Sequence, residues 1–127
     1  MGTLNNILLV GVGGMLGSIA RYLVTIGIDS KLNSVFPYGT FAVNVVGSMI
    51  LGFVIGWVNT KDDSQSLKLL LATGFCGGFT TFSTFALENV TLISQRMNHM
   101  SIIYTMGSLI AGLLAVVAGL WLSKFLV

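Results

Sequence analysis

Four long apolar segments, separated by short polar connections, dominate this chain of 127 residues. They cover residues 4–28, 39–59, 67–95 and 101–125. A helix that crosses a bilayer needs about 20 mainly apolar residues, and each segment is long enough to provide one. Only 8% of the residues are charged, compared with about 25% in a soluble domain, so the chain cannot cover a water-facing surface. We therefore predict an all-α membrane protein, a single domain over residues 1–127 with four transmembrane helices.

The small number of charges and the single cysteine exclude several classes of function. The net charge is +2 and no cluster of basic residues is present, which excludes nucleic acid as a partner. Cys76 is the only cysteine, which excludes an internal disulfide bond and a cysteine-based metal site. The first apolar segment has no basic leader and contains Arg21, so we expect it to remain as the first span. The expected location is the cell membrane (inner or plasma membrane), with membrane lipid around several spans.

Small residues recur at helical spacing on three of the four predicted spans. Such a stripe lets two membrane helices approach closely, because lipid provides no hydrophobic drive for their association. The stripes consist of Gly13 and Gly17 in the first span, Asn44, Ser48, Gly52 and Gly56 in the second, and Gly107, Ala111, Ala115 and Gly119 in the fourth. This is more contact surface than a lone four-helix monomer requires, so we predict a homodimer.

The basic residues give almost no preference for one orientation in the membrane. An even number of spans places both termini on the same side, with Lys61, Lys68 and Lys124. Lys31 and Arg96 then lie on the opposite side. Since the positive side of a membrane protein normally faces the cytoplasm, a difference of three to two permits insertion in either direction. The alternative is that the first span alone decides the orientation.

The segment from Gly74 to Glu88 departs from an ordinary membrane helix. It reads GFCGGFTTFSTFALE, with glycines first and then phenylalanines at every third residue between hydroxyl side chains. Glycine weakens a helix, and threonine and serine can satisfy the backbone groups that a break sets free. We therefore predict that the third helix is broken in the middle of the membrane, next to Gly74, Gly77 and Gly78.

A break of this kind would place polar groups at mid-depth in the bilayer. Freed carbonyl oxygens coordinate cations and freed amides favour anions. The edge of a phenyl ring is positive, so phenylalanines along a narrow path can stabilise an anion without a fixed charge that would trap it. Hydroxyl and carboxamide groups can donate hydrogen bonds to the same ion. The segment suits a small, strongly hydrated anion, although core packing is the commoner use of phenylalanines at this spacing.

Polar side chains within the other spans are further candidates, because such groups are costly in lipid and commonly face a path or the protein interior. Arg21 and Glu88 either pair with each other or line a path. Asn44 either joins two helices by hydrogen bonds or donates to an ion. Tyr104 and Ser108 lie one turn apart on the fourth span and have the same two interpretations.

These residues together resemble the fluoride ion channel family of microorganisms (Fluc/CrcB). The main resemblance is the run from Gly74 to Phe85, with Glu88 after it. Supporting matches are Gly13-x3-Gly17-x3-Arg21 in the first span, Pro37-x-Gly39-Thr40-x3-Asn44 in the second and Tyr104-x3-Ser108 in the fourth. The resemblance covers essentially the whole chain, and the motif of the third span is highly specific.

The resemblance implies an antiparallel, dual-topology homodimer with two separate fluoride pores. It also implies a structural Na⁺ at the dimer centre, which is not transported and which backbone carbonyls of Gly77 and Thr80 hold. Phe82 and Phe85 would present ring edges to fluoride, and Asn44 would donate near the pore.

The fluoride pathway would continue through Ser83 and Thr84, and then along a polar track of Glu88, Tyr104 and Ser108. Arg21 would face a vestibule or pair with Glu88. Some relatives extend the track with hydroxyls where this chain has Gly112 and Val116. The outer part of the track would then rely on water or on the backbone.

The implied function is a fluoride-selective passive channel that exports cytoplasmic fluoride and lowers its toxicity, without enzymatic activity. The alternative is a small multidrug-type cation/proton antiporter, which would use Glu88 as its essential membrane carboxylate. A non-transporting assembly subunit is the third possibility, but that role does not require a polar break in a helix.

Overall fold

The computed structural model describes residues 2–127, and every regular element within them is a helix. Three helices are long and continuous: α1 (Thr3–Leu32), α2 (Tyr38–Val58) and α6 (Asn98–Leu126). Between α2 and α6 the chain forms a segmented helix made of α3 (Ser64–Leu67), the π-helix η1 (Lys68–Cys76), α4 (Gly77–Phe79) and α5 (Ser83–Ser94). With the segmented helix taken as one unit, four helices are long and apolar enough to cross a membrane. The prediction of an all-α membrane protein with four such helices is confirmed.

The helices differ from the predicted spans mainly at their ends. α1 continues through Asp29 and Lys31 to Leu32, whereas the predicted span ended at residue 28. Asn33 then adopts the left-handed conformation (φ 40°, ψ 50°), and its amide donates to the carbonyl of Asp29. This arrangement ends a helix efficiently. The difference arises because hydropathy measures how much of a helix suits lipid, whereas backbone hydrogen bonds decide where the helix stops.

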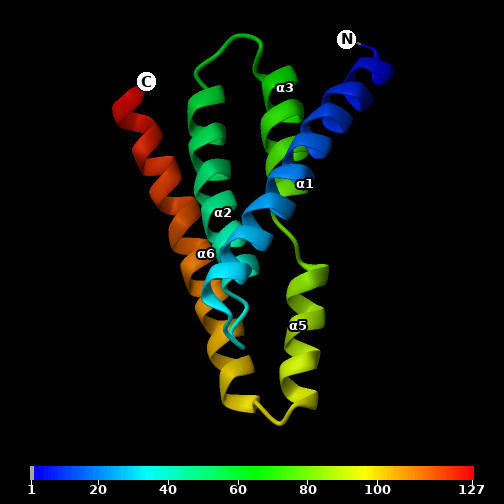
Figure 1. Cartoon of the computed structure of the whole chain (residues 1–127). Coiled ribbons are helices and arrows are strands. Elements are labelled where there is room, and N and C mark those ends of the chain that lie inside the picture. The colour runs from blue at the N-terminus through cyan, green and yellow to red at the C-terminus, as the bar shows by residue number, and fades with distance from the viewer. Residues whose placement is uncertain (1) are drawn as a thin grey trace.

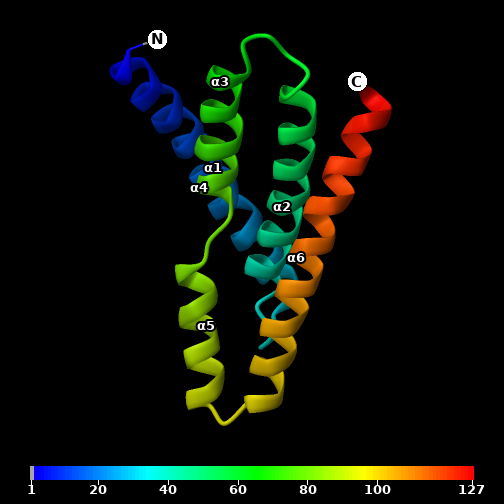
Figure 2. The ribbon, with the colours of Figure 1, turned by 180° about the vertical axis from the view of Figure 1, so that it is seen from behind.

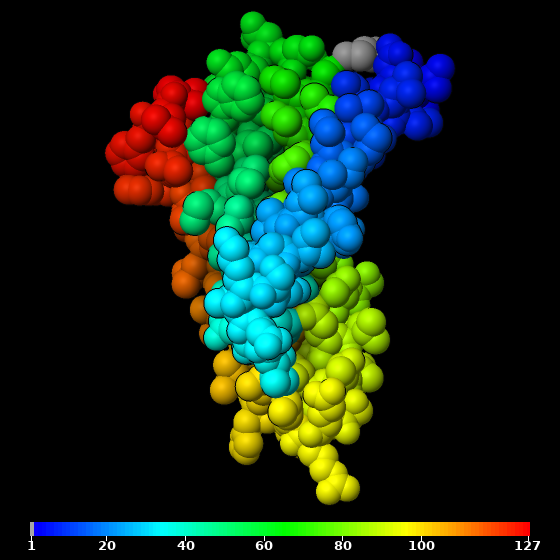
Figure 3. All heavy atoms as spheres, viewed as in Figure 1, coloured from blue at the N-terminus to red at the C-terminus, as the bar shows by residue number. Residues whose placement is uncertain are grey.

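The two termini and the loop between α2 and α3 lie at one end of the molecule, and the turn between α5 and α6 lies at the other (Figure 1). α6 runs beside α2, and α1 crosses η1 and α4. The view from behind shows that an extended stretch separates α5 from α4 (Figure 2). The end of α1 and the loop after it (cyan) lie next to α5 (yellow-green) in the space-filling view (Figure 3).

Glycines bring α1 into backbone contact with the segmented helix. A Cβ added at Gly13 would lie 2.1 Å from the carbonyl oxygen of Leu70, and one added at Gly17 would lie 2.1 Å from that of Phe75. Real Cβ atoms do not approach an oxygen so closely, so neither position can accept a side chain without separating the two helices.

α2 and α6 approach each other in the same way. A Cβ at Gly52 would lie 2.2 Å from the carbonyl oxygen of Val116, and one at Gly119 would lie 2.1 Å from that of Met49. All three predicted stripes therefore contain glycines that pack helices within one chain. Because these stripes are used for packing within one chain, they give no support for a homodimer.

The third helix is broken at residues 80–82, after the glycines rather than at them. Thr80 leaves the helix with an extended backbone (φ −86°, ψ 159°), and α5 begins at Ser83. Gly74 and Gly78 remain helical and serve close packing instead, since a Cβ at Gly78 would lie 2.5 Å from the carbonyl oxygen of Gly14. The π-helix before the break was not predicted.

The apolar core lies in the half of the molecule that holds the termini. Val54, Val58 and Ala72 form its centre, between α2 and η1. In α5, by contrast, Leu92 alone is buried. The segment after the break therefore has little buried apolar packing against the rest of the chain.

Candidate functional site

The carboxamide of Asn44 on α2 holds the backbone of Thr81 inside the break. Asn44 Nδ2 donates to the Thr81 carbonyl oxygen at 3.1 Å, and Asn44 Oδ1 accepts from the Thr81 amide at 2.8 Å. One side chain thus satisfies both backbone groups of a residue that has left the helix, where a buried backbone group without a partner would be costly. Asn44 therefore joins two helices by hydrogen bonds, which is one of the two roles expected from the sequence. Asn44 uses one of the two N–H donors of its Nδ2 in this pairing, and the other is available to an ion.

The break frees the backbone carbonyls of Gly77 and Thr80. In a continuous α-helix the Thr81 amide would donate to Gly77, and the Thr84 amide would donate to Thr80. Here the Thr81 amide donates to Asn44, and the Thr84 amide donates to Thr81 Oγ1 at 3.3 Å. Both carbonyl oxygens have lost their helical donors, and oxygen ligands of this kind suit hard cations. No cluster of three or more His, Cys, Asp or Glu side chains that could hold a metal occurs within residues 2–127.

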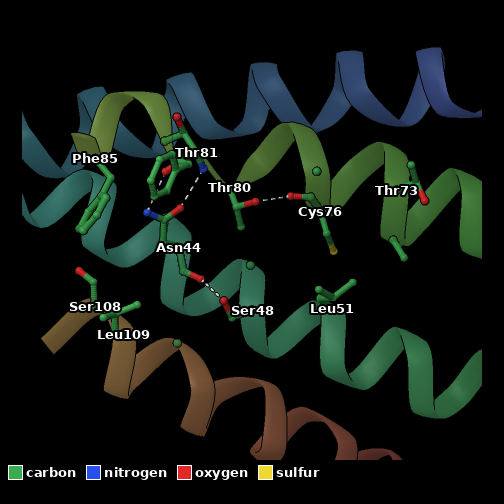
Figure 4. Close-up of a pocket in the computed structure, with 15 residues that line it drawn as sticks. Asn44, Ser48, Leu51, Thr73, Cys76, Thr80, Thr81, Phe85, Ser108 and Leu109 are labelled. Atoms are coloured by element: carbon green, nitrogen blue, oxygen red, sulfur yellow. Dashed lines mark hydrogen bonds between the residues drawn. The ribbon is translucent and has the colours of Figure 1, made fainter. Parts of the chain in front are cut away.

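A cavity of about 370 Å³ lies between α2, the segmented helix and α6 (Figure 4). In the close-up, Asn44, Thr81 and Phe85 gather at one end of it, with Ser108 of α6 on the opposite wall. The polar and aromatic groups on its walls include Asn44, Ser48, Gly77, Thr80, Thr81, Phe82, Phe85 and Ser108. The structure thus brings most of the predicted site residues from three separate spans to one cavity.

The three phenylalanines of the motif have different environments. Phe79 is buried and stacks on Phe75, with ring centroids 5.7 Å apart, so it belongs to the core. Phe82 and Phe85 line the cavity, and their centroids are 5.9 Å apart. The side chain of Phe82 is 79% exposed on the single chain. Phe85 also contacts Tyr104 of α6, at 5.0 Å between centroids and an interplanar angle of 58°.

Two hydroxyls on α6 are buried without a hydrogen-bond partner within residues 2–127. They belong to Tyr104, which is fully buried, and to Ser108, one turn further along the helix. Buried polar atoms of this kind are uncommon in native proteins, and a bound ion or water is a standard partner for them. Tyr104 and Ser108 therefore offer hydrogen-bond donors beside the ring of Phe85.

Glu88 on α5 lies at a second cavity, of about 410 Å³, between α5 and the loop after α1. Thr40 of α2 donates a hydrogen bond of 2.5 Å from Oγ1 to Glu88 Oε1, and the Thr40 side chain is buried. Pro37 lines the same cavity. The carboxylate of Glu88 is therefore anchored on one side and exposed to a hollow on the other.

Arg21 lies close to the break but does not contact Glu88. Its Nε donates to the Gly78 carbonyl oxygen at 2.9 Å, and no ion pair joins it to a carboxylate in the described part of the chain. Ser83 is exposed at the start of α5, and Thr84 Oγ1 accepts from Thr81 Oγ1 at 3.2 Å. Arg21 and Thr84 thus support the backbone around the break, and a direct role of either in a pathway stays a prediction.

Sequence reasoning missed the partners that hold these groups in place. The sequence indicates Thr81 only as one hydroxyl of the motif, yet its backbone is the part that Asn44 binds. Thr40 lies four residues before Asn44, and this spacing places the two residues on the same face of a helix. Ser48 was assigned to a packing stripe, but it lines the cavity. Among the described residues of the other helices, its Oγ is the nearest atom to a Cβ added at Gly112, at 3.8 Å.

A comparison with models of protein families matches residues 8–120 to the family described as CrcB-like protein, Camphor Resistance (CrcB). A "Fluoride-specific ion channel FluC 1" of Ligilactobacillus salivarius (strain UCC118) is 46% identical over 115 residues, which are 91% of this chain and 96% of the relative. A "Fluoride-specific ion channel FluC" of Gloeothece citriformis (strain PCC 7424) is 46% identical over 118 residues, or 93% and 96% of the two chains. A protein of the same name from Caulobacter vibrioides (strain NA1000 / CB15N) is 38% identical over 123 residues, or 95% and 97%.

Proposed function

The chain belongs to the CrcB family, and from this premise we propose that it is a fluoride-selective channel through which fluoride leaves the cell passively. Its relatives are named as ion channels, so the protein is a transport protein of the membrane and not an enzyme. The family relationship supports fluoride as the ion, and the geometry of the site supports the proposed path.

The observation that supports a fluoride path most directly is the pair of unpaired hydroxyls beside the aromatic rings. Tyr104 and Ser108 have donors without a partner, and Phe85 lies against Tyr104. Fluoride is small and strongly hydrated, so donors must replace the water that it loses. Hydroxyl donors together with positive ring edges provide this replacement without a fixed cation, and the ion can therefore leave again.

The path needs no energy source other than the membrane potential. Hydrogen fluoride crosses lipid uncharged and dissociates in a more alkaline cytoplasm, where fluoride is trapped. An inside-negative potential drives an anion outward with about 2.3 kcal/mol per charge for each 100 mV. A passive pore therefore lowers cytoplasmic fluoride and its toxicity.

The functional unit that we propose is an antiparallel homodimer with two pores, in which the chain inserts in both orientations. The exposed ring of Phe82 supports this, because it lines the cavity and would be covered by a second copy. The lysines and arginines at the two ends of the molecule are nearly balanced, which permits both orientations. Labelling of a single introduced cysteine from each side of the membrane tests this, and labelling from one side alone would contradict it.

A structural Na⁺ between the two copies is the remaining part of the proposal. Gly77 and Thr80 of one chain offer two carbonyl oxygens that have lost their helical donors. An inverted second copy would supply two more, and a hard cation bound by all four would hold the two breaks together. The measurement is the dimer fraction of protein purified with Na⁺ or with a large organic cation in its place. An equal dimer fraction in both would contradict a structural role.

The antiporter alternative requires a carboxylate that is free to exchange protons for a cationic substrate. Glu88 accepts a hydrogen bond from the buried Thr40, and the relatives are named as fluoride-specific channels. Neither observation favours an antiporter.

Ion efflux from liposomes that contain the purified protein tests the function. We expect rapid loss of fluoride and negligible loss of chloride, measured with ion-selective electrodes after a potassium ionophore sets the potential. Protein-free liposomes serve as the control. Equal loss of both anions, or proton-coupled uptake of an organic cation in place of fluoride loss, would overturn the proposal.

A further inference from the structure

Asn89 joins α5 to α6 through its carboxamide, one turn beyond Phe85. Its Oδ1 accepts two hydrogen bonds from α6, one from Ser101 Oγ at 2.7 Å and one from Thr105 Oγ1 at 3.0 Å. Its Nδ2 donates to the Phe85 carbonyl oxygen at 3.0 Å. Ser101 is buried, and Asn89 and Thr105 are half-buried. We call Asn89, Ser101 and Thr105 the α5–α6 node.

The two hydroxyls of the node behave differently from most others in the chain. Serine and threonine in a helix commonly donate to a carbonyl of their own preceding turn. Ser48, Thr91 and Ser94 do so here. Ser101 and Thr105 instead both donate across to the neighbouring helix, to one oxygen that has room for two donors. The node is therefore a specific connection between helices.

The position of the node gives it a direct influence on the pathway. Phe85 on α5 and Tyr104 on α6 form a ring contact, and the node follows one turn later on α5. In the described part of α5 only Leu92 is buried, so little apolar packing fixes the rotation of this helix. Hydrogen bonds to α6 can fix it, because Asn89 and Phe85 lie on the same face of α5.

We propose that the α5–α6 node positions the fluoride pathway: it sets the rotation and depth of α5 against α6 and thereby holds the ring of Phe85 against Tyr104. The node itself touches no ion. Asn89 is thus a positioning residue for conduction, and this inference rests on the proposed function of the channel.

The test compares two ways of removing the same hydrogen bonds. Asn89→Leu removes the shared acceptor, and the double variant Ser101→Ala/Thr105→Val removes both donors. Two interhelical hydrogen bonds in a membrane protein shift an equilibrium by roughly tenfold, so we expect each variant to lower fluoride flux per dimer by about that factor. The triple variant should conduct no less fluoride than either of these variants, because all three substitutions remove the same connection between α5 and α6. Ser94→Ala is the matched control, since its hydroxyl on the same helix bonds only to Thr91.

The outcomes separate positioning from a general effect on folding. Flux is divided by the amount of dimer, measured by size-exclusion chromatography, so a variant that merely folds less well keeps its flux per dimer. Normal flux per dimer in Asn89→Leu, or losses that multiply in the triple variant, would overturn the inference. If Asn89→Leu does not assemble into a dimer, the flux of the double variant tests the inference, because that variant removes only hydroxyl groups.

Failure of the node and failure of the proposed function have different signatures. If the wild-type protein conducts no fluoride, the proposed function is wrong. Hydrogen exchange of the α5 amides then tests whether the node holds α5 in place. Faster exchange across α5 in Asn89→Leu than in Ser94→Ala supports the node, and equal exchange contradicts it.

Discussion

Asn44 and Thr81 form two hydrogen bonds with each other, across 37 residues of sequence, and thereby fix the break in the third helix to α2. The carboxamide of Asn44 takes the place of the helical neighbours that Thr81 has lost. This pairing makes the break a defined structure, and it is also what frees the carbonyl of Gly77 from its helical donor. One side chain therefore links the integrity of the fold to the candidate cation site.

Asn44→Ala should destabilise the protein because it leaves both backbone groups of Thr81 without a partner. An unsatisfied buried group costs about 1–3 kcal/mol, so we expect a loss of at least about 2 kcal/mol in the free energy of unfolding. Denaturant unfolding in detergent micelles measures it. Asn59→Ala, at an exposed position just after α2, is the control. A similar loss in both variants would show that the contact with Thr81 is unimportant.

Gly17→Ala should separate α1 from the segmented helix, whereas Gly11→Ala should not. A Cβ at Gly17 would lie 2.1 Å from the Phe75 carbonyl oxygen, but no described atom of another helix lies within 4 Å of a Cβ at Gly11. Overpacking of this kind costs about 1–3 kcal/mol, while alanine in an open helical position gains up to about 1 kcal/mol. The midpoint of thermal unfolding should therefore fall for Gly17→Ala and stay equal or rise for Gly11→Ala. A fall of the same size in both would contradict the close approach.

The sequence predicted the helices and the approximate break well because both follow from local composition. Long apolar runs require helices in lipid, and a cluster of glycines and hydroxyls within one run is a local signal. The exact site of the break was less predictable. Gly74 and Gly78 reduce helix stability in isolation, but in the fold they allow α1 to approach and remain helical. Tertiary packing overrides propensity at these positions.

The partners of the site residues were not predictable from composition, because they come from other spans. Thr40 and Glu88 are 48 residues apart, and Asn89 bonds to Ser101 and Thr105 on the next helix. Spacing within one helix shows which residues share a face, but it does not show which faces meet. The roles of Asn44 and Arg21 in holding backbone carbonyls and amides became visible only when the helices were assembled.

Phe85→Ile should lower fluoride flux and leave the amount of dimer unchanged. The ring of Phe85 lies in the cavity wall and contacts Tyr104, and isoleucine keeps apolar volume there but has no positive ring edge. Phe82→Ile should act in the same direction through the other ring that lines the cavity. Fluoride efflux per dimer measures both. Phe125→Ile, at an exposed position near the end of α6, is the control. Wild-type flux in both Phe82→Ile and Phe85→Ile would mean that the two rings serve packing alone.

Gly112→Ser should be accepted by the fold and should add a hydroxyl to the cavity wall one turn beyond Ser108. The nearest atom of another helix to a Cβ at Gly112 is Ser48 Oγ, at 3.8 Å, which is ordinary contact. A Cβ at Gly119 on the same helix would instead lie 2.1 Å from the Met49 carbonyl oxygen. Gly119→Ser is therefore the destabilising counterpart, with a loss of about 1–3 kcal/mol in the free energy of unfolding. If fluoride passes this wall, a hydroxyl donor there replaces part of the hydration shell of the ion. We therefore expect Gly112→Ser to conduct fluoride at least as fast as the wild type. A loss of flux with unchanged stability would contradict this prediction, because the added hydroxyl would then obstruct the route of the ion instead of replacing its water.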